Sequence, residues 1–174
     1  MSPGNEVTII DRQKKYEMDH GVLAEAVDGV LHLFGAGGQE VGIVLVSDRT
    51  MRGFNRQYRG VLGTTDVLSF AMQEAPHGKV GSGVLGDLVV SLEQIERQAC
   101  VEWPGPRPPT GTLQRELALM VIHGLLHLLG FDHDTPGNEE RMIRKESELF
   151  NETWTTFPTY SAKGVSSSSP KSSR

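Results

Sequence analysis

Residues 112–133 read TLQRELALMVIHGLLHLLGFDH, and this segment constrains how the rest of the chain can be arranged. Residues 112–129 are mostly apolar and contain no proline, which predicts one long helix that packs into a core. Gly130 follows it, and glycine commonly ends a helix because it adopts a left-handed backbone at little cost. The remaining elements should therefore pack around this helix.

Three of the six histidines fall in this segment, as His123, His127 and His133. Residues four apart share one face of a helix, so the first two imidazoles can approach one metal ion, and the reversal at Gly130 can return the third. A lone histidine on a helix is more often a hydrogen-bonded core residue than a ligand, but this spacing of three favours metal. Imidazole ligation favours zinc, with nickel or iron as alternatives, and three ligands leave an open position.

The spacing HxxxHxxGxxH is also that of the metzincin peptidases, whose motif is HExxHxxGxxH. Position 124 is Gly here instead of Glu. In those enzymes the glutamate takes the proton from zinc-bound water, so its absence argues against peptidase activity while leaving the metal ligands intact.

Upstream of the long helix, strands and helices alternate. Residues 6–10 and 41–46 are β-branched apolar runs of strand length. Between them, residues 19–34 repeat apolar side chains with helical spacing. Residues 47–58 predict a helix capped by Ser47 or Asp48.

Two further strands are expected at 66–71 and 84–90, where they can pair as a hairpin. Residues 91–101 predict a short helix, residues 104–111 (PGPRPPTG) a loop, and residues 138–150 a charged helix. The pattern predicts an α+β fold, a single domain with a small mixed β-sheet packed against helices, and the metal site on the long helix and the turn after it.

Length and composition fit one soluble domain. The 174 residues are 37% hydrophobic and 22% charged, which excludes collagen-like, coiled-coil and wholly disordered classes. The lone Cys100 rules out an internal disulfide, no apolar run is long enough to span a bilayer, and no signal peptide is recognisable. We therefore expect a cytoplasmic protein with a domain at 1–155 and a disordered serine-rich tail at 156–174.

Several motifs together resemble a known family. NRQYRG (55–60), TTDVLSF (64–70), LGDLVVS (85–91) and the histidine segment occur in the order seen in the YbeY-type family of bacterial single-strand-specific metallo-endoribonucleases, which are ribosomal RNA maturation factors. The resemblance covers residues 6–151. It implies an α+β fold, one Zn²⁺ held by the three histidines, ribosome-associated RNA as substrate, and a functional arginine at Arg59. The proline-rich segment 103–109 and the serine-rich tail are peculiar to this chain, and the resemblance implies no function for either.

Arginine recurs along the helix expected at 47–58. Arg49, Arg52, Arg56 and Arg59 are spaced by three and four residues and would form one stripe that can track phosphates. A solvated helix face explains the first three equally well. The last 14 residues carry three basic and no acidic residues, so the net charge of −5 becomes −8 over residues 1–160, and the stripe is unusual there. Arg59 can also stabilise charge on a phosphoryl group beside a metal.

Five polar residues are weaker candidates. Asp87 can orient a histidine as a hydrogen-bond acceptor or simply stabilise a turn. Asp132 flanks His133 and can do the same, whereas Asp134 is expected to bond amides before Pro136. Asp66 and Ser69 can line the groove beside the metal.

Three functions remain open on this reading. The first is a single-strand-specific zinc-dependent endoribonuclease acting in ribosomal RNA processing, maturation and ribosome quality control, with Arg59 as its catalytic residue. The second is a ribosome-assembly RNA-binding factor with a structural zinc, and the third is another metal-dependent hydrolase. Expected partners are single-stranded or ribosomal RNA and the ribosome or small-subunit assembly factors, with no membrane and no DNA.

Overall fold

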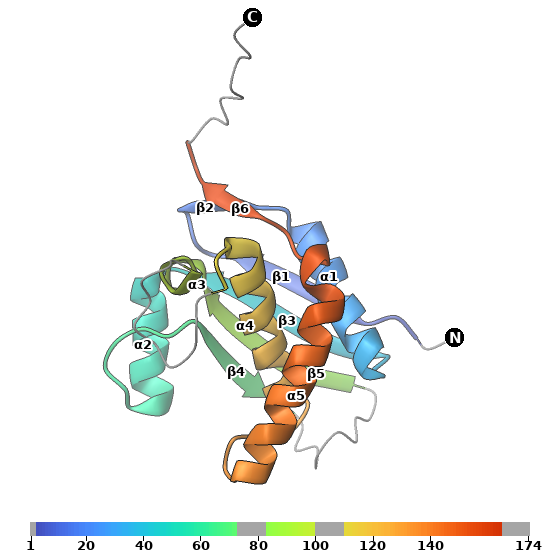
Figure 1. The fold of residues 1–174 in the computed structure, drawn as a ribbon. Coiled ribbons are helices and arrows are strands. Elements are labelled where there is room, and N and C mark those ends of the chain that lie inside the picture. The colour runs from blue at the N-terminus through green and yellow to red at the C-terminus, as the bar shows by residue number, and fades with distance from the viewer. Residues whose placement is uncertain (1–2, 73–82, 100–109, 165–174) are drawn as a thin grey trace, which may run out of the picture.

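A computed structural model of the chain describes residues 3–72, 83–99 and 110–164. These residues form a four-stranded sheet, a two-stranded ribbon and helices that pack mainly on one face of the sheet (Figure 1). The strands are β1 (Glu6–Asp11), β2 (Tyr16–Met18), β3 (Gln39–Val46), β4 (Val67–Ala71), β5 (Gly83–Ser91) and β6 (Tyr160–Ala162). The helices are α1 (His20–Phe34), α2 (Asp48–Arg59), α3 (Leu92–Ala99), α4 (Leu113–Leu128), α5 (Pro136–Thr153) and the short 3₁₀ helix η1 (Trp154–Thr156).

The sheet is mixed, with strand order β1-β3-β5-β4. β1, β3 and β5 run parallel, while β4 lies antiparallel to β5 with Val67 opposite Val90. The sequence analysis expected the strands at 66–71 and 84–90 to pair as a hairpin, and the pairing of β4 with β5 confirms this. β4 is therefore an edge strand, and its outer side is free to line a site.

The main core lies between the sheet and helices α1, α4 and α5. Val41, Ile43 and Leu45 of β3 point into this core, as alternation along a strand requires. Figure 1 shows α4 crossing in front of the sheet with α5 beside it. The apolar character of α4 follows from this position, because it contacts β4 and β5 on one side and α5 on another.

The opposite face of the sheet is covered only in part. Met51 of α2 packs there on Val46, Leu68 and Val89, which form a second, smaller cluster. Away from α2 this face is open, and Ile10 is 42% exposed. The sheet thus has one face built into the core and one face that α2 covers near β4.

The sequence predictions match the fold class and most elements, with two differences at the helix after the metal segment. α5 begins at Pro136 and not at residue 138, because Thr135 caps it by accepting from the Asn138 N–H and proline is tolerated in the first turn. It also continues to Thr153 instead of ending at residue 150.

The packed part of the chain also extends beyond residue 155, where the sequence analysis placed the start of a disordered tail. β6 pairs antiparallel with β2, and the buried ring of Tyr160 contacts Tyr16 edge-on at 5.2 Å between centroids. Phe157 is buried as well. Cys100, the proline-rich segment 103–109 and residues 165–174 lie outside the described residues. In the described ranges, no helix is both long and apolar enough to cross a lipid bilayer.

Candidate metal centre and active site

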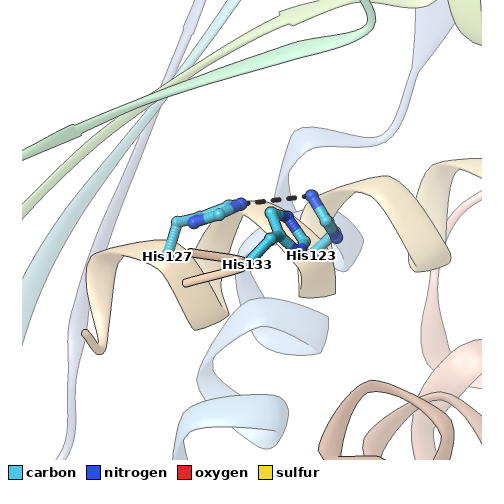
Figure 2. Close-up of side chains that lie close together, drawn as sticks. All are labelled: His123, His127 and His133. Carbon is cyan, nitrogen blue, oxygen red and sulfur yellow. Dashed lines mark hydrogen bonds between the residues drawn. The ribbon is translucent and has the colours of Figure 1, made fainter. Parts of the chain in front are cut away.

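His123 and His127 lie one turn apart on α4, as their spacing predicts. Their ring centroids are 4.8 Å apart, and their Nε2 atoms approach to 3.2 Å (Figure 2). The two rings emerge from an otherwise buried helix, where residues such as Leu125 and Leu126 are fully enclosed. Packing of α4 against the sheet therefore fixes where both imidazoles stand.

The turn after α4 returns the third histidine to the same point. Gly130 has φ 93°, and the Phe131 N–H bonds the carbonyl of Leu126, which is the hydrogen-bond pattern of a glycine-terminated helix. The His133 ring then lies 4.9 Å from His127 and 5.3 Å from His123. One ligand atom of each histidine lies within 4.8 Å of the others, so the group can hold a metal ion.

Hydrogen bonds on the far side of two rings set their tautomers. His123 Nδ1 lies 2.7 Å from Glu146 Oε2, and His127 Nδ1 lies 3.0 Å from the carbonyl oxygen of Phe131. Both partners are acceptors, so both Nδ1 atoms carry the proton and both Nε2 atoms present lone pairs. The sequence analysis missed Glu146, because only the packing of α5 against α4 brings this carboxylate to the histidine.

Two facing lone pairs at 3.2 Å repel each other unless a cation lies between them. Nitrogen ligands of a tetrahedral zinc ion, each about 2.1 Å from the metal, would be about 3.4 Å apart. Burial lowers the pKa of His127, and the positive charges that His123 and His133 would carry lower it further. Both effects favour the neutral imidazole, which is the form that binds metals, and the donor set fits zinc.

The histidines open into a pocket of about 690 Å³. Arg59 lines the same pocket although it is far away in sequence, so the structure brings together all four predicted site residues. The other lining residues come from the loop before β4, from β4 itself and from the turn after α4: Thr65, Asp66, Val67, Leu68, Ser69, Ala71, Gly130, Phe131 and Asp132.

The acidic candidates divide into three groups. Asp66 and Asp132 line the pocket but accept from backbone amides, those of Val67 and His133, each at 2.7 Å. Asp134 accepts from the Asn138 side chain. Asp87 does not orient a histidine: its carboxylate lies over Gly42, and because its neighbour Leu88 packs against α4, alternation places it on the opposite face of the sheet.

The sequence matches the family described as Endoribonuclease YbeY over residues 8–153. The chain belongs to the YbeY family. It is 45% identical over 151 residues to Endoribonuclease YbeY of Pelotomaculum thermopropionicum, which covers 82% of this chain and 93% of that protein. It is 44% identical over 120 residues to Endoribonuclease YbeY of Anaeromyxobacter sp., covering 68% of this chain and 57% of that longer protein. A Thermotoga maritima protein of known solution structure is 27% identical, with a TM-score of 0.57 and coverage of 86% of this chain and 89% of that one.

Position 124 of this YbeY chain requires glycine for packing reasons. A Cβ there would lie 2.9 Å from Leu88 Cδ2 and 3.1 Å from Val67 Cγ2, because α4 approaches the sheet closely at this point. The Gly124 carbonyl also accepts from the Ser69 hydroxyl at 3.1 Å. A side chain at this position would point at the sheet, so the residue could not supply the base of the metzincin motif.

The arginine stripe of this YbeY chain lies on the exposed side of α2. Arg49, Arg52, Arg56 and Arg59 are all exposed, and among the described residues none of them forms an ion pair. Only Arg59 lines the histidine pocket. It stands on the last turn of α2, where Gly60 ends the helix. The stripe therefore leads toward the pocket and ends in it.

Proposed function

We propose that this chain is a zinc-dependent endoribonuclease that cleaves single-stranded RNA in ribosomal RNA processing. Membership of the YbeY family makes it an RNA-cleaving hydrolase. The observation that carries the proposal is the convergence, in one open pocket, of three histidine nitrogens and a guanidinium that forms no ion pair with a described residue. In a metal-dependent nuclease, a Lewis acid and a hydrogen-bond donor together stabilise the charge that builds on phosphate.

The three histidines would hold the zinc through the nitrogen atoms that face the pocket. A bound zinc ion polarises a phosphoryl oxygen and lowers the pKa of coordinated water toward 7. Glu146 and the Phe131 carbonyl keep the opposite nitrogens protonated, which orients two of the rings and fixes their tautomers. These two contacts are the chain's own contribution to ligand geometry.

Arg59 would bind the non-bridging oxygens of the scissile phosphate. Its guanidinium is planar and offers a fork of donors that matches two phosphate oxygens. Negative charge on those oxygens grows toward the transition state, so the interaction strengthens as the reaction proceeds. Arg59 forms no ion pair with a carboxylate among the described residues, so its guanidinium is available for this role.

The open pocket favours a catalytic metal over a structural one. Structural zinc sites are closed by four protein ligands, whereas here three histidines converge and His133 is exposed at the mouth of the pocket. A peptidase is disfavoured because Asp66 and Asp132 serve backbone amides and position 124 faces the sheet.

The biological setting is part of the same proposal. The resemblance of the family motifs implies ribosomal RNA as substrate and the ribosome or small-subunit assembly factors as partners. The proposal also includes a role in ribosome quality control and a cytoplasmic location, where this RNA is processed.

The test compares substrates and metal states of the purified full-length chain. We expect cleavage of unstructured RNA, with little cleavage of duplex RNA, single-stranded DNA or peptide. Activity should disappear with a chelator and return with added zinc. Robust peptide cleavage, or RNA cleavage that persists after the metal has been removed, would contradict the proposal.

A further inference from the structure

Three aromatic side chains gather where α2 meets the edge strand β4. Tyr58 stacks on Phe54 with 5.9 Å between centroids and 21° between planes, and it meets Phe70 edge-on at 5.1 Å. Phe54 and Phe70 are half-buried on the small cluster beneath α2, while Tyr58 is 56% exposed. The tyrosine ring is thus held by neighbours yet accessible to a ligand.

Two separate chain segments connect this aromatic group to the histidine pocket. Tyr58 directly precedes Arg59, which lines the pocket. Phe70 lies on β4 between Ser69 and Ala71, which line it as well. Side chains alternate along a strand, so the pocket and the aromatic group occupy the two faces of one edge strand.

The backbone at this edge is also open to a ligand. In an antiparallel pair, every second residue of a strand bonds to its neighbour through both N–H and C=O. The Ser91 N–H donates to the Asp66 carbonyl and the Met72 N–H to the Leu85 carbonyl, so the even-numbered residues around β4 are the ones that bond to β5. The N–H and C=O groups of Ser69 therefore point away from β5, across the outer side of the edge strand. A chain passing from the pocket to Tyr58 crosses this polar edge.

The charge of α2 indicates which kind of chain would bind. The helix carries four arginines and one aspartate, whereas residues 1–160 together have a net charge of −8. Arginines in a row attract successive phosphates, and an exposed aromatic ring among them stacks on a base. An apolar surface for a protein partner would not require the arginines.

We propose that Tyr58, supported by Phe70, is the stacking platform for an unpaired base of the RNA whose phosphate is held at the histidines and Arg59. This inference rests on the proposed function and names the part of the substrate that is recognised. The faces of paired bases are covered by their neighbours in a duplex, so only an unpaired nucleotide can occupy the platform. The platform is therefore a physical source of single-strand preference.

The test measures RNA binding of the full-length chain in the presence of a chelator, which keeps the RNA intact. The variants are Tyr58→Ala, Tyr58→Phe and the control Leu33→Ala, which removes a side chain that is 51% exposed on α1 and does not line the histidine pocket. Fluorescence anisotropy reports binding to an unstructured RNA of about 12 nucleotides and to a duplex of the same length.

We expect Tyr58→Ala to raise the Kd for the single strand about 5- to 20-fold, with Tyr58→Phe within about twofold of wild type. Leu33→Ala and all duplex affinities should not change. A scan of the RNA with single abasic nucleotides should find one position that weakens binding to wild type but adds nothing to Tyr58→Ala. A purely structural role of the tyrosine would not produce this lost coupling.

Wild-type affinity in Tyr58→Ala would overturn the proposal, and the exposed surface of Tyr58, Val61 and Leu62 would then belong to a protein contact. Failure of Tyr58→Phe to retain binding would overturn it too. Because binding is measured without cleavage, a wild-type chain that cleaves no RNA would defeat the proposed function while leaving this result readable.

Discussion

Helices α4 and α2 supply the same pocket from opposite environments. α4 lies between the sheet and α5, and its histidines emerge from a surface that is otherwise packed. α2 buries only Asp48, Met51 and Asn55, and its arginines stand in solvent. The three histidines are thus placed by the core, whereas Arg59 is placed only by where its helix ends. Changes on α4 should therefore alter fold and chemistry together, and changes on α2 should separate them.

The largest expected effect comes from one substitution made in both helices. Gly124→Glu forces a carboxylate against Leu88 and Val67, so we expect a loss of more than about 3 kcal/mol in the free energy of unfolding. Gly53→Glu, in α2, meets nothing within 4 Å and should leave stability unchanged or raise it by up to about 1 kcal/mol. Urea unfolding of both variants checks this.

Equal stability of the two glutamate variants would show that α4 is not packed as tightly as described. Gly124→Glu also rebuilds the HExxH string of a peptidase. We expect no gain of peptide cleavage, because the new side chain would point toward the sheet.

The next largest effect is expected at Arg59. Arg59→Gln removes the charged guanidinium fork that would face the developing charge, and such donors contribute about 10²- to 10³-fold in rate. The free energy of unfolding should change by less than about 0.5 kcal/mol, since the side chain is exposed. Single-turnover cleavage at saturating RNA measures the rate and thermal unfolding the stability, and an unchanged zinc content serves as the control for an intact metal site. A wild-type cleavage rate would remove Arg59 from the chemical step.

A smaller effect is expected at Glu146, whose carboxylate contacts the His123 ring. Glu146→Gln replaces an ionised acceptor at His123 with a neutral amide, and loss of such contacts lowers metal affinity about 10- to 100-fold. Competition with a zinc chelator measures the affinity. The matched control is Glu148→Gln on the same helix: Glu148 pairs with Lys145 on the surface, so this variant should bind zinc normally. Identical affinities in both variants would mean that Glu146 does not orient the ligand.

The smallest effect is expected at Arg52, in the middle of the arginine stripe. Arg52→Glu should weaken RNA binding mainly at low salt and leave the cleavage rate at saturation near wild type, because a phosphate contact outside the pocket acts through counterion release. The slope of log Kd against log salt should fall by about one. An unchanged slope would show that the RNA does not follow α2.

Local spacing predicted what depends on local structure. The positions of His123 and His127 on one helix face and the reversal at Gly130 follow from helix geometry, and of the two expected caps, Ser47 and Asp48, it is Ser47 that caps α2. The family resemblance named Arg59, and the structure adds that it reaches the pocket. Spacing alone could not have given this, because the end of α2 and the end of α4 meet only through the sheet.

Contacts between distant segments could not be predicted. β2 and β6 are three residues each and pair across most of the chain, so neither carries a recognisable strand pattern by itself. In the sequence, nothing distinguishes Glu146 from the other acidic residues of α5. Only the packing of α5 against α4 places its carboxylate beside His123. The sequence left open whether Asp87 orients a histidine or stabilises a turn, because LGDLVVS has apolar residues on both faces of the strand, and periodicity does not tell which face meets the helices.

The metal centre can be tested directly by zinc analysis of gently purified protein, combined with X-ray absorption at the zinc edge. We expect about one zinc per chain with three imidazole nitrogen neighbours at about 2.0 to 2.1 Å and one further oxygen ligand, from water, at the open position. His127→Ala should lose the metal. A chain that holds no zinc even after zinc is added, or whose zinc content is unchanged in His127→Ala, would contradict the assignment of the three histidines.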